Sequence, residues 1–152
     1  RAPSLENQPT PVFNAQTLYT LPKQLRSTQT NFSKTGGIHA AALINPQGEC
    51  TLAMEDVGRH NAVDKLIGKS LLENKLPLHK SALLLSGRGG FELIQKAHVA
   101  GIPMVIALGA PTTMAVALAH QMGITLIGFL KNDRFNIYSH PHRVDTEKRE
   151  NT

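Results

Sequence analysis

The fold is decided by residues 81–109, which read SALLLSGRGGFELIQKAHVAGIPMVIALG. Two apolar runs, Ser81–Leu85 and Met104–Leu108, have the length of buried strands. The segment between them has a helical pattern from Phe91 to Ala100 and stops at Gly101. A strand, a helix and a second strand in this order predict two parallel strands joined by a right-handed crossover.

The same alternation continues in both directions along the chain. Downstream, a helix that ends near Gly123 leads into a third apolar run, Ile124–Phe129. Upstream, a helix begins at Arg59, after two short strands that a tight turn joins into a β-hairpin, His39–Ile44 and Cys50–Met54. We therefore predict an α/β domain of three layers, α/β/α, with a mixed sheet that is parallel in its centre and antiparallel at the hairpin.

Outside this alternation the sequence predicts less structure. We assign residues 1–34 to a linker followed by short helices, which Pro22 interrupts, residues 35–140 to the α/β domain, and residues 141–152 to a polar C-terminal tail. The sequence begins at Arg1 without an initiator methionine, which favours a fragment of a longer protein.

Composition excludes several classes of protein. The net charge of +5 is compatible with an anionic partner, but aromatic residues make up only 5% and no basic block stands out, so nucleic-acid binding is not favoured. No apolar run is long enough to cross a membrane, and no signal peptide is recognisable.

A single cysteine, Cys50, excludes an internal disulfide and a cysteine-built zinc site, and no metal site is expected around His140 and His142. A reducing, cytoplasmic setting follows as the default.

Polar residues gather where the predicted strands lead into helices, at residues 55–60, 86–90 and 109–113. In a parallel sheet these junctions meet at one edge, where each helix start presents free N–H groups and a positive dipole end that suit phosphate. Arg59 and Arg88 could bind phosphate bidentately, with Ser86 adding a hydroxyl. The alternative is that the junctions are ordinary turns and helix caps.

The first junction opens the most polar run of the chain, Glu55–Lys65. Asp56 is a candidate N-cap for the following helix. His60 and Asp64 are four residues apart, so they share a helix face and could hydrogen-bond to each other, while Lys65 is expected to be solvated. Whether His60 is structural or functional stays open at this point.

Several blocks of sequence occur in an order that matches a known family: Thr35–Leu43, Glu55–Gly68, Ser86–Arg88, Gln95–Ala97, Ala100–Pro103, Ala110–Pro111, Gly128–Phe129 and Arg134–Tyr138. Together they resemble the FdhD family, the formate dehydrogenase accessory sulfurtransferases. The resemblance runs from about residue 12 to residue 144 and implies a cytidine deaminase-like fold.

The resemblance also implies a function. Members of the family take sulfur from a cysteine desulfurase and carry it to the molybdenum cofactor of formate dehydrogenase, a bis-molybdopterin guanine dinucleotide. A guanine nucleotide pocket is therefore expected, with GDP as a mimic, and a homodimer is left open. The stretch that matches the cofactor-binding segment of the family consists of Phe129, Leu130, Lys131, Asn132, Asp133 and Arg134. We expect it to act with Arg59, His60, Asp64, Ser86 and Arg88.

The chain departs from the family at Gly89-Gly90 and Gly109, which lack hydroxyls often found there, and above all in its cysteines. Family members carry sulfur on a Cys-x-x-Cys loop just before the region that corresponds to Arg1, and no such motif is present here. Cys50 does not align with that loop, so no catalytic residue is assigned within the chain, and whether it counts as an enzyme stays open.

Two other readings remain beside the sulfur carrier. His60 falls near the position of the zinc-binding histidine of deaminases, but residues 86–90 lack the cysteine pair, so zinc-dependent hydrolysis is not supported. The remaining alternative is a zinc-less module of deaminase fold that acts only as a docking partner.

Overall fold

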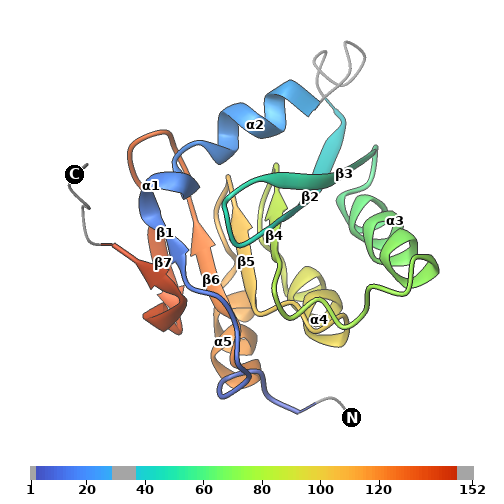
Figure 1. Ribbon diagram of the computed structural model, residues 1–152. Helices are drawn as coiled ribbons and strands as arrows, with labels where there is room; N and C mark the ends of the chain where they lie inside the picture. The colour runs from blue at the N-terminus through green and yellow to red at the C-terminus, as the bar shows by residue number, and fades with distance from the viewer. Residues whose placement is uncertain (1–2, 29–36, 147–152) are drawn as a thin grey trace.

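The computed structural model describes residues 3–28 and 37–146, and its centre is a six-stranded sheet (Figure 1). The strand order is β3-β2-β4-β5-β6-β7. The strands are β2 (His39–Ile44), β3 (Cys50–Asp56), β4 (Ala82–Leu85), β5 (Met104–Ala107), β6 (Thr125–Gly128) and β7 (Asn136–Ser139).

The strand directions confirm the predicted mixed sheet. β4, β5 and β6 are parallel, whereas β2 and β3 form an antiparallel hairpin that pairs with β4. β7, which the sequence analysis did not anticipate as a strand, pairs antiparallel with β6. The carboxyl ends of β3, β4, β5 and β6 therefore lie at one edge of the sheet, which we call the carboxyl edge; the arrowheads of β4 and β5 point to it in Figure 1.

Helices cover both faces of the sheet and complete the three predicted layers (Figure 1). One face packs against α3 (Arg59–Leu72), α4 (Phe91–Val99) and α5 (Thr113–Met122). The other face packs against α1 (Ala15–Leu18) and α2 (Leu21–Thr28). None of these helices in the described ranges combines the length and the apolar character that a bilayer crossing requires.

The central strands contribute alternate side chains to the two hydrophobic cores, one on each face of the sheet. All four residues of β4 are buried, with Leu83 and Leu85 in the core beneath α3 to α5, and Ala82 and Leu84 in the core on the α2 side. Successive side chains of a strand point to opposite faces, so a strand covered on both sides must be apolar throughout. This is why β4, β5 and β6 appear in the sequence as uninterrupted apolar runs.

The N-terminal helices differ in detail from the prediction. Pro22 does not interrupt a helix but occupies the first turn of α2, where a missing N–H costs nothing because that group has no helical partner. Before α1, the chain forms a short strand, β1 (Phe13–Asn14), which pairs in parallel with β8 (Val144–Asp145).

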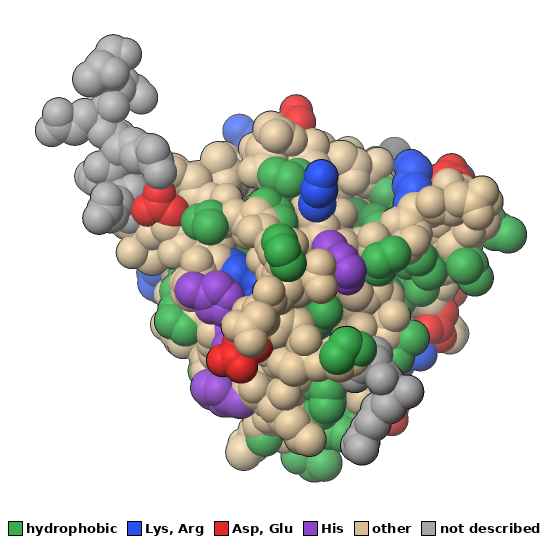
Figure 2. All heavy atoms as spheres, turned by 60° about the horizontal axis from the view of Figure 1, so that its bottom comes forward, with side chains coloured by type: hydrophobic (Ala, Val, Ile, Leu, Met, Phe, Trp, Pro, Cys, Tyr) green, Lys and Arg blue, Asp and Glu red, His purple; other side chains and the backbone are tan. Residues whose placement is uncertain are grey.

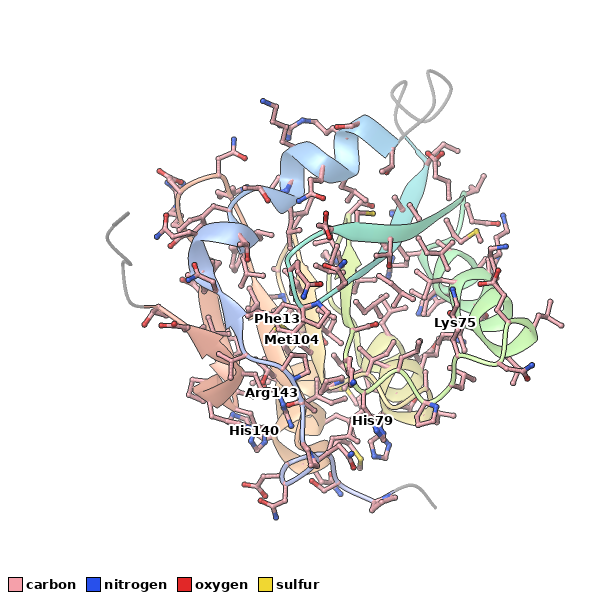
Figure 3. The ribbon with its side chains drawn as sticks, in the orientation of Figure 1. Phe13, Lys75, His79, Met104, His140 and Arg143 are labelled. Carbon is pink, nitrogen blue, oxygen red and sulfur yellow. The ribbon has the colours of Figure 1, made fainter. Side chains whose placement is uncertain are left out.

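The residues next to β8 are packed rather than tail-like, which corrects the expectation for residues 141–146. Arg143, the last residue of the short 3-10 helix η2 (Pro141–Arg143), is 1% exposed. It lies where the N-terminal segment crosses the lower end of the sheet (Figure 3). Its guanidinium donates to the oxygens of Leu5, Thr10, Pro103, Gly123 and Thr125.

The N-terminal segment is likewise packed, so residues 3–12 are not a free linker. The side chain of Leu5 is buried, and its backbone N–H donates to the carbonyl of Met122 at the end of α5 over 2.7 Å.

Burial lowers the pKa of Arg143, yet arginine stays charged because its ordinary pKa is above 12. Five oxygens compensate this buried charge, so Arg143 joins both ends of the described chain to the sheet.

We predict that Arg143→Met lowers the free energy of unfolding by about 3 kcal/mol, because it leaves buried oxygens without donors. The control is Arg134→Met: Arg134 is exposed and its described ion-pair partner is neighbouring Asp133 at 3.4 Å, so its loss should cost less than about 0.5 kcal/mol. Urea unfolding of both variants measures the difference. Equal stability of the two variants would contradict the role given to Arg143.

Candidate functional site

The loops at the carboxyl edge form one hydrogen-bonded surface. The N–H of Gly109 donates to the carbonyl of Gly87 over 3.0 Å, and the N–H of Phe129 donates to Gly109 over 3.1 Å. At Gly128 a Cβ atom would lie 2.4 Å from Cδ of Pro111, so only glycine allows β6 to end this close to the neighbouring loop. The second and third predicted junctions and the loop after β6 are thus brought together.

Two of the three helix starts at this edge are left open. α3 begins after Gly58 and α4 after Gly90, and neither glycine supplies a side-chain cap. By contrast, α5 is closed by its own N-cap, because the Thr112 hydroxyl accepts a hydrogen bond from the N–H of Ala115 over 3.1 Å. Uncapped N–H groups at a helix start attract anions. The open starts are those whose junctions carry Arg59 and Arg88.

Three basic side chains at the edge, Arg59, Arg88 and Lys131, have no carboxylate partner in the described part of the chain. Arg88 and Lys131 are exposed, and no ion pair holds either side chain. Arg59 lies on the inward stripe of α3, four residues before buried Val63. Its Nε is buried, and no described group accepts from it. A buried donor without an acceptor is uncommon in proteins, and at this position it fits a bound anion.

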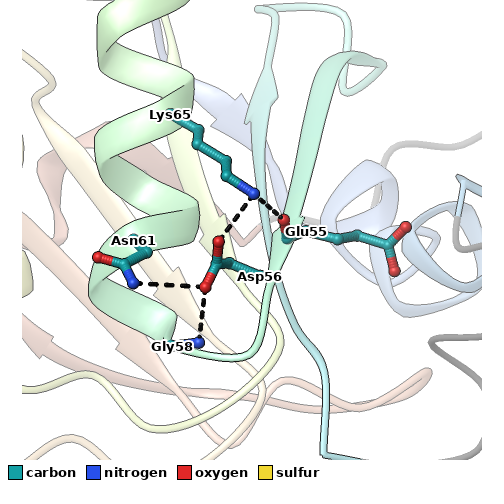
Figure 4. A network of polar contacts seen from close by, with 5 residues as sticks. All are labelled: Glu55, Asp56, Gly58, Asn61 and Lys65. Atoms are coloured by element: carbon teal, nitrogen blue, oxygen red, sulfur yellow. Dashed lines mark hydrogen bonds and ion pairs between the residues drawn. The ribbon is translucent and has the colours of Figure 1, made fainter.

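Asp56 is the centre of a polar network that closes the turn between β3 and α3 (Figure 4). The prediction that Asp56 is the N-cap of α3 is wrong. Gly58 occupies the N-cap position and donates its N–H to the Asp56 carboxylate over 2.9 Å. Lys65 is not merely solvated, since its Nζ lies 2.7 Å from Asp56 Oδ2 and 2.9 Å from the carbonyl of Glu55. These contacts lower the pKa of Asp56 to about 2, with Lys65 as the largest cause.

Glu55, the residue before Asp56, points away from α3 (Figure 4). Adjacent strand residues face opposite sides of the sheet, so Glu55 lies on the side opposite the Asp56 network. One of its carboxylate oxygens, Oε2, is buried without a described partner. Glu55 therefore does not neutralise Arg59.

His60 and Asp64 do not bond to each other, although they share a face of α3. His60 Nε2 lies 3.3 Å from Glu92 Oε2, and Asp64 Oδ1 lies 2.7 Å from Lys96 Nζ, so each residue pairs with α4. The predicted pair of His60 with Asp64 within α3 is thus replaced by two pairs between α3 and α4. These contacts join α3 to α4 just below the open helix starts and keep the two starts side by side.

Ser86 has a structural contact at the edge. Its hydroxyl accepts a hydrogen bond from the N–H of Ala40 over 2.9 Å and so ties the end of β4 to β2.

The loop after β6 has one anchored residue and an exposed tip. Leu130 is 2% exposed and anchors the loop in the core on the α2 side. Lys131, Asn132, Asp133 and Arg134 form an exposed turn, closed by the Lys131 N–H to Arg134 carbonyl bond of 2.8 Å.

Phe129 is the unusual residue of this loop. Its φ of 54° lies in the left-handed region, which is strained for an aromatic residue. The backbone bond to Gly109 holds it there, and the side chain remains 42% exposed. The result is an aromatic ring held at the surface of the carboxyl edge.

His39 belongs to this edge although it was not among the site residues predicted from the sequence. It is the first residue of β2 and lies opposite Asp56 in the sheet register. Its place could have been inferred from topology: the amino end of an antiparallel strand shares an edge with the carboxyl ends of its parallel neighbours.

Cys50 and the histidines of the opposite pole lie away from the site. Cys50 begins β3 and is six residues from Asp56, about 20 Å along an extended strand. Burial raises the pKa of its thiol, which disfavours the reactive thiolate.

Figure 2 brings the opposite pole forward and shows histidine side chains gathered there. Within residues 3–28 and 37–146, no group of three or more His, Cys, Asp or Glu side chains is arranged to hold a metal ion.

Comparison with known proteins places this geometry in a family. Residues 2–145 match the family described as FdhD/NarQ. The sulfur carrier protein FdhD of Streptomyces avermitilis is 48% identical over 141 residues, which cover 93% of this chain and 50% of the relative. The chain thus spans about half the length of the curated relatives it matches.

Solved structures agree with the fold. A Desulfotalea psychrophila protein, assigned as a formate dehydrogenase accessory protein, superposes with a TM-score of 0.80 and 28% identity over 88% of this chain and 59% of that one. The guanine deaminase of Nitrosomonas europaea superposes with a TM-score of 0.60 and 14% identity, over 84% of each chain. The second match concerns the fold alone and confirms the predicted deaminase-like architecture.

The Asp56 network predicts how stability depends on pH. Its carboxylate has a lower pKa in the folded chain than when unfolded, so its contribution is complete above about pH 4 and disappears as the pH falls toward about 2. We expect Asp56→Asn to have a lower melting temperature than the parent at neutral pH. The difference should shrink between about pH 4 and about pH 2.

The control for this experiment is Asp133→Asn, which removes an exposed carboxylate whose described partner is its neighbour Arg134. Its melting temperature should follow that of the parent at every pH. A difference between parent and Asp56→Asn that persists unchanged at about pH 2 would contradict the network.

Proposed function

Because this chain belongs to the FdhD/NarQ family, we propose that its carboxyl edge binds the guanine nucleotide part of a molybdenum cofactor, bis-molybdopterin guanine dinucleotide. We further propose that the chain is the cofactor-binding part of a sulfur carrier that serves formate dehydrogenase. The name of the Streptomyces avermitilis relative supports the carrier role, and that of the Desulfotalea psychrophila protein supports the link to formate dehydrogenase.

The observation that carries this proposal is the set of unpaired cations beside the open helix starts. Arg59, Arg88 and Lys131 have no carboxylate partner among the described residues, and the starts of α3 and α4 have no side-chain cap. A dinucleotide brings several phosphate charges, which arginine binds through charge-assisted and bidentate hydrogen bonds. The buried Nε of Arg59 fits such a group, because an oxygen acceptor at this position would complete its hydrogen bonding.

The length of the edge suits an elongated ligand. From β3 to β6 the strand order is β3-β2-β4-β5-β6, which is four steps of about 4.8 Å, or roughly 19 Å. Arg59 stands near one end of this span, and Lys131 follows β6 at the other. A single anion would occupy only part of it, whereas a dinucleotide can contact both ends.

Phe129 supplies a contact of a different kind. Its exposed ring sits at the β6 end, next to the exposed turn that contains Lys131 and Arg134. A flat heteroaromatic ring, such as guanine or a pterin, gains free energy by stacking on an aromatic side chain. The β6 end therefore offers stacking together with positive charge, while the α3 end offers charge and N–H groups.

Sulfur itself is carried by a group other than Cys50 in this proposal. The Cys50 thiol has a raised pKa and lies about 20 Å along β3 from the edge. A cysteine desulfurase would supply the sulfur, formate dehydrogenase would receive the sulfurated cofactor, and both would be met in the cytoplasm. A homodimer is compatible with this scheme.

The test measures GDP binding, because GDP contains the guanine and phosphate groups without the pterin. We expect GDP to raise the melting temperature of the chain, by an amount that grows with the logarithm of its concentration. Arg88→Ala should weaken binding about tenfold, since it removes a charge-assisted contact. Isothermal titration calorimetry measures the dissociation constants directly.

The matched control is Lys80→Ala, which removes an exposed cation from the chain just before the amino end of β4, at the opposite edge. It should bind GDP like the parent. Equal weakening by both variants would indicate general charge attraction instead of a site. Absence of GDP binding by the parent, together with capture of formate dehydrogenase, would favour the alternative of a docking module.

A further inference from the structure

His39 is the first residue of β2 and lies at the carboxyl edge between the ends of β3 and β4. In the register of the hairpin it lies directly opposite Asp56. On its other side β2 is antiparallel to β4, and Ala41 pairs with Leu85. Because His39 precedes Ala41 by two residues, its neighbour is the residue two positions after Leu85, which is Gly87, just past the end of β4. Paired residues project to the same face, and Ala41 belongs to the core beneath α3 to α5. His39 therefore projects to the face on which α3 and α4 begin.

Gly87 leaves one side of the His39 ring uncovered. A Cβ atom at position 87 would lie 3.5 Å from Nδ1 and 3.8 Å from Cε1 of this ring, which is ordinary contact distance. The glycine is thus not required by crowding, and its φ does not lie in the left-handed region. Its effect is to keep Nδ1 of His39 open toward the Ser86–Gly90 loop.

The His39 ring has no partner in the part of the chain that the structure describes. Among the described residues no hydrogen bond or ion pair involves the His39 side chain, although the residue is half-buried. Half-buried polar groups in folded proteins usually find a protein or solvent partner. An open ring nitrogen at the centre of the site can instead contact a ligand.

The charged groups around His39 favour an anion as that ligand. Asp56 on β3 is already neutralised by Lys65 of α3 and by the N–H of Gly58. On α4, Glu92 is paired with His60. The remaining charges, Arg59 at the start of α3 and Arg88 in the loop after β4, are positive and have no ion-pair partner among the described residues. Glu55 of β3 has an unpartnered carboxylate oxygen but lies on the opposite face of the sheet. Among the described residues of these elements, no free carboxylate on the His39 face therefore competes for a protonated His39.

We propose that His39 is a positioning residue that, in its protonated form, donates a hydrogen bond to an anionic oxygen of the bound nucleotide. This inference rests on the proposed function and assigns a residue to the stretch of edge between Arg59 and Arg88. Histidine changes its charge between about pH 5 and pH 8. Nucleotide affinity then contains a component that is present at about pH 6 and absent at about pH 8.

The experiment compares GDP affinity of the parent and His39→Gln by isothermal titration calorimetry at about pH 6 and about pH 8. Glutamine keeps a hydrogen-bonding group but cannot take up a proton. At about pH 6 the variant should bind about tenfold more weakly, and at about pH 8 the two proteins should bind alike. Titration of the GDP phosphate affects both proteins equally, so the ratio of their dissociation constants isolates His39.

A second variant, Gly87→Ala, leaves His39 in place and adds a methyl group beside Nδ1. It should weaken GDP binding at about pH 6 and have little effect at about pH 8. In nuclear magnetic resonance spectra of the parent, the ring signals of His39 should move on addition of GDP, which a purely structural histidine would not show. Melting temperatures without ligand confirm that both variants fold.

The outcomes separate the two proposals. If the parent binds GDP and His39→Gln binds equally well at about pH 6, the role of His39 is overturned while the nucleotide site stands. If the parent fails to bind GDP at either pH, the proposed function is overturned and the role of His39 falls with it. A loss of affinity that is the same at both pH values would also contradict a protonated His39, because it indicates a neutral contact.

Discussion

The parallel pairing of β4, β5 and β6 is the constraint on which the rest of the structure depends. Parallel strands require crossover helices, and both crossovers place their helices on one face, where α3 also packs. As a consequence β4, β5 and β6 end at the same edge, and the helices that follow β4 and β5, which are α4 and α5, begin there. The carboxyl edge exists because of this geometry, before any particular side chain is considered.

Charge at the carboxyl edge is divided into two groups. On the face covered by α3 and α4, three acidic side chains are paired: Asp56 with Lys65, Asp64 with Lys96, and Glu92 with His60. Three basic side chains at the edge, Arg59, Arg88 and Lys131, have no such partner in the described ranges. Ion pairs between α3 and α4 thus fix the helix starts, while unpaired cations remain for an anion. This division supports a nucleotide site more specifically than the net charge of +5 does.

Sequence patterns predicted most of the fold and part of the site. The hairpin, the parallel strands and the three layers are confirmed, because buried strands and amphipathic helices have different periods of apolar residues. The family resemblance is confirmed as well. Partners of side chains were predicted poorly. His60 and Asp64 have the spacing for a pair within a helix, yet each pairs with a residue of α4. The packing of α4 against α3 places Glu92 within 3.3 Å of His60 and Lys96 within 2.7 Å of Asp64.

The sequence by itself determined the order of the elements and the position of the polar junctions, because periodicity and turn residues act over short distances along the chain. Only the tertiary structure decided which groups meet. Arg143 lies in a polar stretch of sequence, yet it is buried, because oxygens from three separate segments converge on it. His39 joins the site in the same way, because strand register places it beside Asp56 and Gly87. Contacts of this kind depend on the pairing of distant segments, which local sequence does not encode.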